Sequence, residues 1–230
     1  MGFKPEDFFD LSKFNYADLY KGTEYIWQVI SQIGEYVETK LKEIGAKNLG
    51  TLRGNPYVDD NVYIGEGTVI EHGAMVKGPA IIGANCEIRN GAYIRGNFLC
   101  DDGTVIGNSC EIKNAVIHQN GNVPHFAYVG DSILGYKAHL GAGVKISNVK
   151  LTWETVKVDI GDKIIDTGLK KFGAILADET DIGCNSVLNP GSIIGKRCIL
   201  YPNCSWRGVL PAGHIVKVRQ TQEVVVREER

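Results

Sequence analysis

A six-residue spacing of apolar side chains runs through most of the chain and limits the folds it can adopt. From Leu52 every sixth residue is apolar at eleven consecutive positions, and the spacing returns after two interruptions. The positions are Leu52, Val58, Ile64, Ile70, Val76, Ile82, Ile88, Ile94, Cys100, Ile106 and Ile112, then Leu134, Leu140 and Ile146, then Leu176, Ile182, Leu188, Ile194, Leu200 and Trp206. A period of six fits neither an α-helix nor a hairpin meander, and it predicts a mainly β chain wound into a parallel β-helix of hexapeptide repeats.

Composition agrees with such tight winding. Glycine contributes 28 of 230 residues, about 12% against a usual share of roughly 7%. The position four residues after the apolar one is mostly small, and four of the six cysteines occupy it: Cys86, Cys110, Cys198 and Cys204. We therefore predict that these cysteines are small buried packing residues rather than metal ligands or nucleophiles.

The repeat pattern divides the chain into three parts. Residues 51–218 carry the repeats, with predicted excursion loops at about 115–128, where the phase shifts, and at 150–172, where no hexapeptide is clear. Residues 1–50 are predicted to be helical, and residues 219–230 to form a strand or a tail. We expect the helical segment to pack on the first coil or on a neighbouring subunit, since either contact hides an open end of the β-helix.

Charge and targeting signals exclude several classes of protein. The formal net charge is −2 and the pI is about 6.2, which does not favour nucleic-acid binding. The N-terminus shows no signal peptide, and no apolar stretch reaches membrane-spanning length. A cytoplasmic protein without membrane or nucleic-acid partners is the expectation.

A group of polar residues between 89 and 148 is the candidate site. His125 is the best general-base candidate because an imidazole titrates near neutral pH, and Tyr128 is a plausible partner. Arg95 and Lys113 are 18 residues apart, about one triangular coil, so they are expected to stack and could hold a phosphate. Spacing alone leaves open that both are solvated edge residues.

These residues also form a family motif. Residues 124–132 read PHFAYVGDS, and Gly141-Ala142-Gly143 and Asn148 follow at the spacing found in one known enzyme family. The region from about 80 to 205 resembles the hexapeptide-repeat acetyltransferase domain of bifunctional glucosamine-1-phosphate acetyltransferases and sugar-1-phosphate nucleotidylyltransferases, the archaeal type above all. The resemblance implies a left-handed β-helix, acetyl-CoA as the acyl donor, and an amino-sugar phosphate or amino-sugar nucleotide as acceptor.

The resemblance also implies residue roles. His125 would deprotonate the amine for direct attack on the thioester, and Asn148 would position the reacting groups. The acceptor would contact Arg95, Lys113, Tyr128 and Lys157, together with His139 and Glu154, which replace a family asparagine and lysine. The thioester slot would be lined by Ala142, Gly143, Gly173 and Ala174.

Alternatives remain at this point. Some hexapeptide enzymes hold zinc with three histidines, for which His118, His125 and His139 would have to converge. The chain could also be a non-catalytic sugar-nucleotide-binding or scaffold protein, a reading that the changes at His139 and Glu154 favour. Pyrophosphorylase activity is not expected, because about 50 residues precede the repeats and a glycine-rich phosphate loop is missing from them. A homotrimer is expected from the resemblance.

Overall fold

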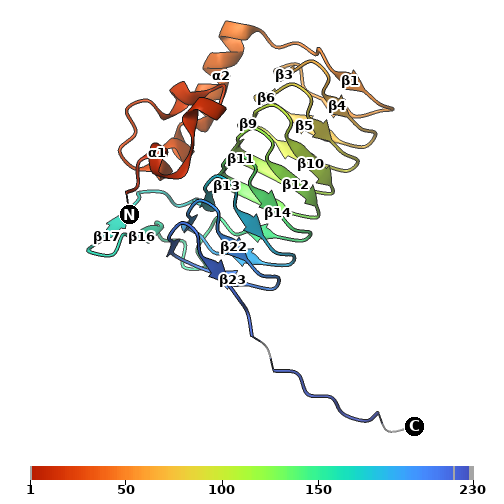
Figure 1. Ribbon diagram of the computed structural model, residues 1–230. Helices are drawn as coiled ribbons and strands as arrows, with labels where there is room; N and C mark the ends of the chain where they lie inside the picture. Colours follow the sequence, from red (N-terminus) through yellow and green to blue (C-terminus); the bar gives the residue numbers. More distant parts are fainter. Residues whose placement is uncertain (1, 220, 228–230) are drawn as a thin grey trace.

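The computed structural model describes residues 2–219 and 221–227, and its dominant feature is a triangular stack of parallel coils (Figure 1). Each coil contributes a short strand to each of three flat faces, which meet at three edges. Edge A follows face 1, edge B follows face 2 and edge C follows face 3. The predicted fold class, a mainly β parallel β-helix with a helical N-terminal segment, is confirmed.

The strands of each face are as follows. Face 1 contains β1 (Thr51–Leu52), β4 (Val69–Ile70), β7 (Glu87–Ile88), β10 (Val105–Asn108), β12 (Asn122–His125), β14 (His139–Leu140), β19 (Asp181–Ile182), β22 (Ile199–Leu200) and β25 (Ile215–Val216). Face 2 contains β2 (Tyr57–Val58), β5 (Met75–Lys77), β8 (Tyr93–Arg95), the first parts of β11 (Glu111–Ile117) and β13 (Tyr128–Leu134), β15 (Lys145–Ile146), β20 (Val187–Leu188) and β23 (Ser205–Trp206). Face 3 contains β3 (Val62–Ile64), β6 (Ala80–Ile82), β9 (Phe98–Cys100), the second parts of β11 and β13, β18 (Ala174–Leu176), β21 (Ser192–Ile194) and β24 (Val209–Leu210).

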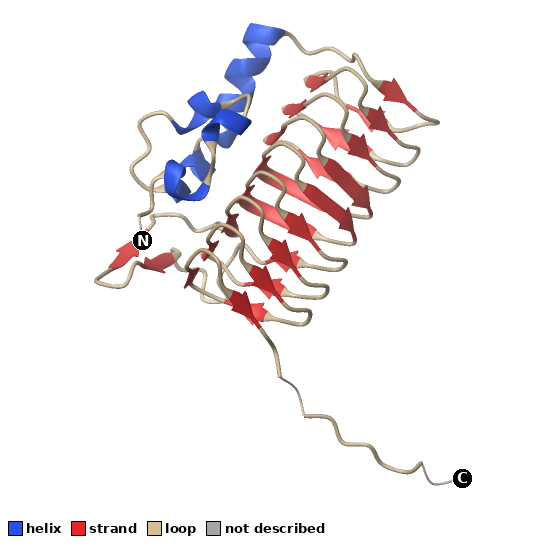
Figure 2. Cartoon of the chain, in the orientation of Figure 1, coloured by secondary structure: helices blue, strands red, loops and turns tan. Residues whose placement is uncertain are grey.

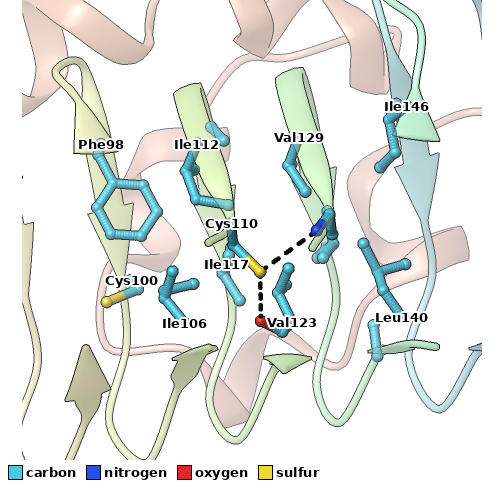
Figure 3. Close-up of a cluster of buried hydrophobic side chains, with 14 of the residues drawn as sticks. Phe98, Cys100, Ile106, Cys110, Ile112, Ile117, Val123, Val129, Leu140 and Ile146 are labelled. Carbon is cyan, nitrogen blue, oxygen red and sulfur yellow. Dashed lines mark hydrogen bonds between the residues drawn. The ribbon is translucent and has the colours of Figure 1, made fainter. Parts of the chain in front are cut away.

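The hexapeptide apolar residues point into the stack and form its core (Figure 3). Ile106, Ile112 and Leu140 are all fully buried, and their equivalents above and below stack on them. The four cysteines at the small position of the repeat, Cys86, Cys110, Cys198 and Cys204, are buried, as predicted. Cys110 Sγ lies 3.2 Å from the carbonyl oxygen of Val123 and 3.4 Å from the amide nitrogen of Ala127, so it packs between coils (Figure 3).

The expected loop at 115–128 is wrong. These residues stay within the coils, as the ends of β11, all of β12 and the start of β13. The phase shifts because the coil is one residue shorter there: Val105 pairs with Asn122, 17 residues on, whereas Glu87 pairs with Val105, 18 residues on. The missing residue is absorbed at a turn, and no segment leaves the stack.

The second interruption is a true excursion. His139 pairs with Asp181, 42 residues on, so the chain between 146 and 174 leaves the stack at edge B. It carries an antiparallel hairpin of β16 (Lys157–Asp159) and β17 (Ile164–Asp166). Val156 and Phe172 are buried where the excursion leaves and rejoins the coils, so it is packed against them.

The N-terminal segment lies along face 3 rather than over the first coil (Figure 2). It consists of α1 (Pro5–Phe8), η1 (Leu11–Lys13), η2 (Ala17–Tyr20), η3 (Ile26–Ser31) and α2 (Ile33–Ile44). Its aromatic residues pack on a column of outward apolar side chains that includes Ile81, Leu99 and Val116. Leu52, in the first coil, remains 43% exposed. The expected contact with the first coil is therefore replaced by a lateral one.

The chain leaves the stack after β25, and residues 221–227 form no strand. The end of the predicted segment 219–230 lies outside the described residues. Among the described residues, neither helix has the length and hydropathy that a bilayer crossing requires.

Candidate functional site

The predicted site residues lie on two different edges of the β-helix. His125 ends β12 and stands exposed at edge A. The amide of Gly143 donates a hydrogen bond of 3.0 Å to the carbonyl oxygen of His125, so Ala142 and Gly143 occupy the same edge one coil further on. The structure thus brings the predicted base next to the predicted start of the thioester slot.

Edge A continues into an apolar groove of about 320 Å³. Gly141, Cys184, Tyr201 and Pro202 line it at successive coils, and Cys184 is the one exposed cysteine of the described residues. His139 also lines this groove, with Nδ1 at 3.3 Å from Asp181 Oδ1. The groove was not predicted from the sequence. Cys184 was a signal for it, because this residue occupies neither the apolar position of the hexapeptide nor the small position four residues later.

A polar cluster occupies edge B. Arg95 and Lys113 lie at the ends of neighbouring strand segments, and the pairing of Ile94 with Ile112 keeps their 18-residue offset. Each cation already has a carboxylate partner: Arg95 Nη1 lies 2.7 Å from Glu111 Oε1, and Lys113 Nζ lies 3.7 Å from Asp131 Oδ2. The predicted stacking is therefore present, but both charges are compensated within the chain.

Asp131 organises this cluster, although the sequence did not single it out within the motif. Its side chain is 6% exposed and its backbone is left-handed, with φ of 50°. One carboxylate oxygen accepts a hydrogen bond from Asn114 Nδ2 at 2.9 Å, and the other accepts one from Asn148 Nδ2. Asn114 Nδ2 also lies 3.2 Å from the carbonyl of Ile30, which joins the cluster to the N-terminal segment.

The orientation of Asn148 follows from these bonds. Because its Nδ2 is used by Asp131, its Oδ1 is left to accept a hydrogen bond from a ligand. A Cβ at Gly130 would lie 2.7 Å from the Tyr128 hydroxyl and 2.8 Å from Asn148 Nδ2, so the two side chains converge over a glycine. Burial, with Asp131 and Glu111 nearby, raises the pKa of Tyr128, which keeps its hydroxyl protonated.

The excursion residues have distinct settings. Glu154 Oε2 lies 3.1 Å from Lys150 Nζ and accepts a hydrogen bond from Thr152, and Lys150 is the main cause of its lowered pKa. Lys157 begins β16 and is exposed. Glu154 is thus ionised and compensated by Lys150.

Gly173 and Ala174 do not join Ala142 and Gly143. Both are buried at edge B, where the Gly173 amide donates to the carbonyl of Asp131 at 2.8 Å. The Ala174 amide donates to Ser132 Oγ at 3.0 Å. Within one chain they lie at the opposite end of face 2 from Ala142 and Gly143, and both are buried, so their role in the cofactor slot stays a prediction.

The three histidines considered for zinc lie in three places. His118 is buried at edge C, with its Nε2 2.6 Å from the Tyr20 hydroxyl. His125 stands at edge A, and His139 lies on face 1. Within residues 2–219 and 221–227, no three histidine, cysteine, aspartate or glutamate side chains are grouped to hold a metal ion.

Comparison with known proteins gives consistent matches. The GMPPB C-terminal domain family model matches residues 76–165. A bifunctional sugar-1-phosphate nucleotidylyltransferase/acetyltransferase of Sulfurisphaera tokodaii is 32% identical over 75% of this chain, which spans 43% of that protein. The putative uncharacterized acetyltransferase YaiX of Escherichia coli is 34% identical, and the match covers 79% of each chain. The crystal structure of the polySia-specific acetyltransferase NeuO is 13% identical, covers 78% of this chain and 91% of its own, and has a TM-score of 0.44.

Proposed function

This chain belongs to the hexapeptide-repeat acetyltransferase family, and from that premise we propose that it transfers an acetyl group from acetyl-CoA to the amine of a sugar phosphate or sugar nucleotide. The observation that carries the proposal is the exposed side chain of His125 at edge A. Its backbone carbonyl accepts a hydrogen bond from Gly143, which is two residues from Gly141 in the lining of the apolar groove. An apolar groove suits the long, uncharged arm of a thioester donor.

The chemistry needs a neutral amine, because an ammonium group has no lone pair with which to attack. His125 accepts a proton from the amine, which attacks the thioester carbonyl carbon and forms the new C–N bond. The C–S bond then breaks, and the proton held by His125 passes to the departing thiolate. No covalent enzyme intermediate is required, so the buried cysteines have no part in the reaction.

Edge B offers the groups for the acceptor. Asn148 Oδ1 can accept a hydrogen bond from the amine and so direct its lone pair, while the Tyr128 hydroxyl can bind a sugar oxygen. The Asn148 amide cannot rotate freely, because Asp131 holds its Nδ2. These positions support the roles inferred for Tyr128 and Asn148.

The two edges lie at opposite ends of face 2, so one chain does not bring His125 to Asn148. We propose that a homotrimer completes the site. With face 2 of three copies turned toward a common axis, edge A of each copy lies beside edge B of the next, and such a contact closes into a ring. Face 3 is already covered by the N-terminal segment, and of the two remaining faces only face 2 is bounded by both edge A and edge B. The cytoplasm, where acetyl-CoA is made available, is the proposed location.

The experiment is thiol release from acetyl-CoA with a panel of amino-sugar 1-phosphates and amino-sugar nucleotides. Release should require an acceptor and should be lost in His125→Ala. His214→Ala is the matched control, because His214 is exposed at edge C and bonds only neighbouring carbonyls. No release across the panel, with sugar-nucleotide binding still measurable by calorimetry, would favour the non-catalytic binding protein.

Mixing two inactive variants tests the shared site. His125→Ala retains Asn148, and Asn148→Ala retains His125, so mixed trimers contain interfaces with both groups intact. Co-refolded at equal amounts, they should recover about a quarter of the wild-type activity. No recovery, with mixed assemblies present by mass spectrometry, would place the whole site in one chain.

A further inference from the structure

A second cavity lies between the excursion and the coils, and of its charged lining residues only Lys157 was given a role by the family resemblance. The cavity measures about 290 Å³ and lies at edge B, between the excursion and the last coils. Lys150, Lys157 and Arg207 line it together with Asp159, and the backbone of Gly191 forms part of its wall. Asn148, in the polar cluster, is two residues from Lys150, so the cavity continues the edge on which the acceptor is proposed to bind.

The cavity has fixed walls. A Cβ at Gly191 would lie 2.5 Å from Val156 Cγ1, which shows how closely the excursion approaches the coil. The Gly191 amide lies 2.9 Å from the carbonyl of Gly173, and the Thr167 hydroxyl donates to the carbonyl of Val156 at 2.7 Å. The cavity is therefore part of the packed structure at both ends of the excursion.

Its charge differs from that of the polar cluster. Glu154 compensates Lys150. Within the described residues Lys157 and Arg207 form no ion pair, and the one carboxylate in the cavity lining is Asp159. Arg95 and Lys113, by contrast, are both paired at 3.7 Å or less. Lys157 and Arg207 are thus two cations of edge B that can still take an anion, and both line this cavity.

We propose that the cavity is a diphosphate subsite, in which Arg207 and Lys157 each bind one phosphate and Lys150 adds charge at the side nearest Asn148. A guanidinium binds two phosphate oxygens at once, and an ammonium acts as a point charge, so the pair suits two linked phosphates better than one. The inference rests on the proposed function, because it extends the acceptor edge. A diphosphate occurs in a nucleotide-linked sugar and also in the nucleotide part of coenzyme A.

The test is calorimetric titration of the full chain at low ionic strength, without acetyl transfer. The probes are inorganic phosphate, pyrophosphate, UDP, GDP, dTDP and coenzyme A. Pyrophosphate or a diphosphate nucleotide should bind once per chain and more tightly than phosphate. Arg207→Gln or Lys157→Gln should weaken that binding by about tenfold or more. Arg197→Gln, which removes an exposed arginine at edge C, should leave it unchanged.

The arms separate the possible sources. If the Arg207 and Lys157 variants lose affinity only for the nucleoside diphosphates, the subsite belongs to a nucleotide-linked acceptor. If they lose affinity only for coenzyme A, it belongs to the donor. Equal binding by wild type and both variants would overturn the proposal. If diphosphate binding depends on Arg207 but no acetyl transfer occurs, the subsite stands and the proposed function is refuted. If acetyl transfer occurs and its KM values are unchanged in both variants, the proposed function stands and the subsite is refuted.

Discussion

Acidification should destabilise this protein through one buried histidine. His118 is 1% exposed, stacked on Phe14 with ring centroids 3.8 Å apart, and within 2.6 Å of the Tyr20 hydroxyl. Burial lowers the pKa of His118 from 6.5 to about 3. The folded protein therefore keeps the ring neutral while the unfolded chain binds a proton below pH 6.5, so stability falls as the pH drops from 6.5 toward 3.

The size of the effect follows from the two pKa values. The slope is about 1.4 kcal/mol per pH unit well below 6.5, and integration from pH 7 to pH 5 gives a loss of about 2 kcal/mol from this residue. Burial raises the pKa values of Asp101 and Asp178, and these carboxyls act in the opposite direction. A comparison of wild type with a variant that lacks the imidazole subtracts their contribution.

The assay is urea unfolding at pH 7 and pH 5 for wild type and His118→Gln. Wild type should lose about 2 kcal/mol more than the variant between the two pH values. The imidazole carbon resonances of His118 in the folded wild type should also stay in their neutral positions down to pH 5, which checks the cause without a variant. Identical pH dependence in both proteins, or a ring that titrates near 6.5, would refute the reasoning.

Three further changes have expected outcomes that thermal or urea unfolding can check. Leu99→Ala should lower the free energy of unfolding by about 2–5 kcal/mol, because Leu99 is fully buried between face 3 and the N-terminal segment. Leu151→Ala, at a side chain that is 99% exposed, should change it by no more than about 0.5 kcal/mol. Equal costs would contradict the lateral packing. Asp131→Asn should lower the free energy of unfolding by about 1–3 kcal/mol, because it removes the counter-ion of Lys113, whose side chain is 25% exposed. Glu111→Gln should cost less than about 1 kcal/mol, because its ion pair with Arg95 is exposed. The reverse order would contradict the central place of Asp131 in the polar cluster. Gly107→Ala should cost at least about 3 kcal/mol, since the new Cβ would lie 1.5 Å from a backbone oxygen of the next coil, and a melt like that of wild type would show that the coils can separate freely.

The repeats were predictable because every inward position meets the same environment, so one side-chain type recurs at a fixed interval. The lateral docking of the N-terminal segment was missed, although its signal was present. Ile81, Leu99 and Val116 are central residues of apolar triplets on face 3, and a strand that is apolar on both sides is covered on both sides.

The site was only partly predictable for a geometric reason. Which edge a residue occupies depends on the sum of all coil lengths before it, and one-residue shortenings such as that between Val105 and Asn122 change this sum without a visible motif. Family resemblance grouped His125, on edge A, with Asn148 and Gly173, on edge B, and one chain alone does not bring these edges together. Asp131 was missed because its role lies in the orientation of Asn148 rather than in a recognisable chemistry of its own.

The lateral N-terminal segment has a consequence for how the molecule opens. A stack of repeats normally frays coil by coil from its ends, since each coil contacts only its neighbours. Here Asn114 bonds the carbonyl of Ile30, and the amide of Asp178 bonds the carbonyl of Phe8, so one segment links coils that do not touch each other. The coils between β6 and β21 should therefore exchange their amide protons in one cooperative event, and the first coil and the residues after β24 should exchange earlier.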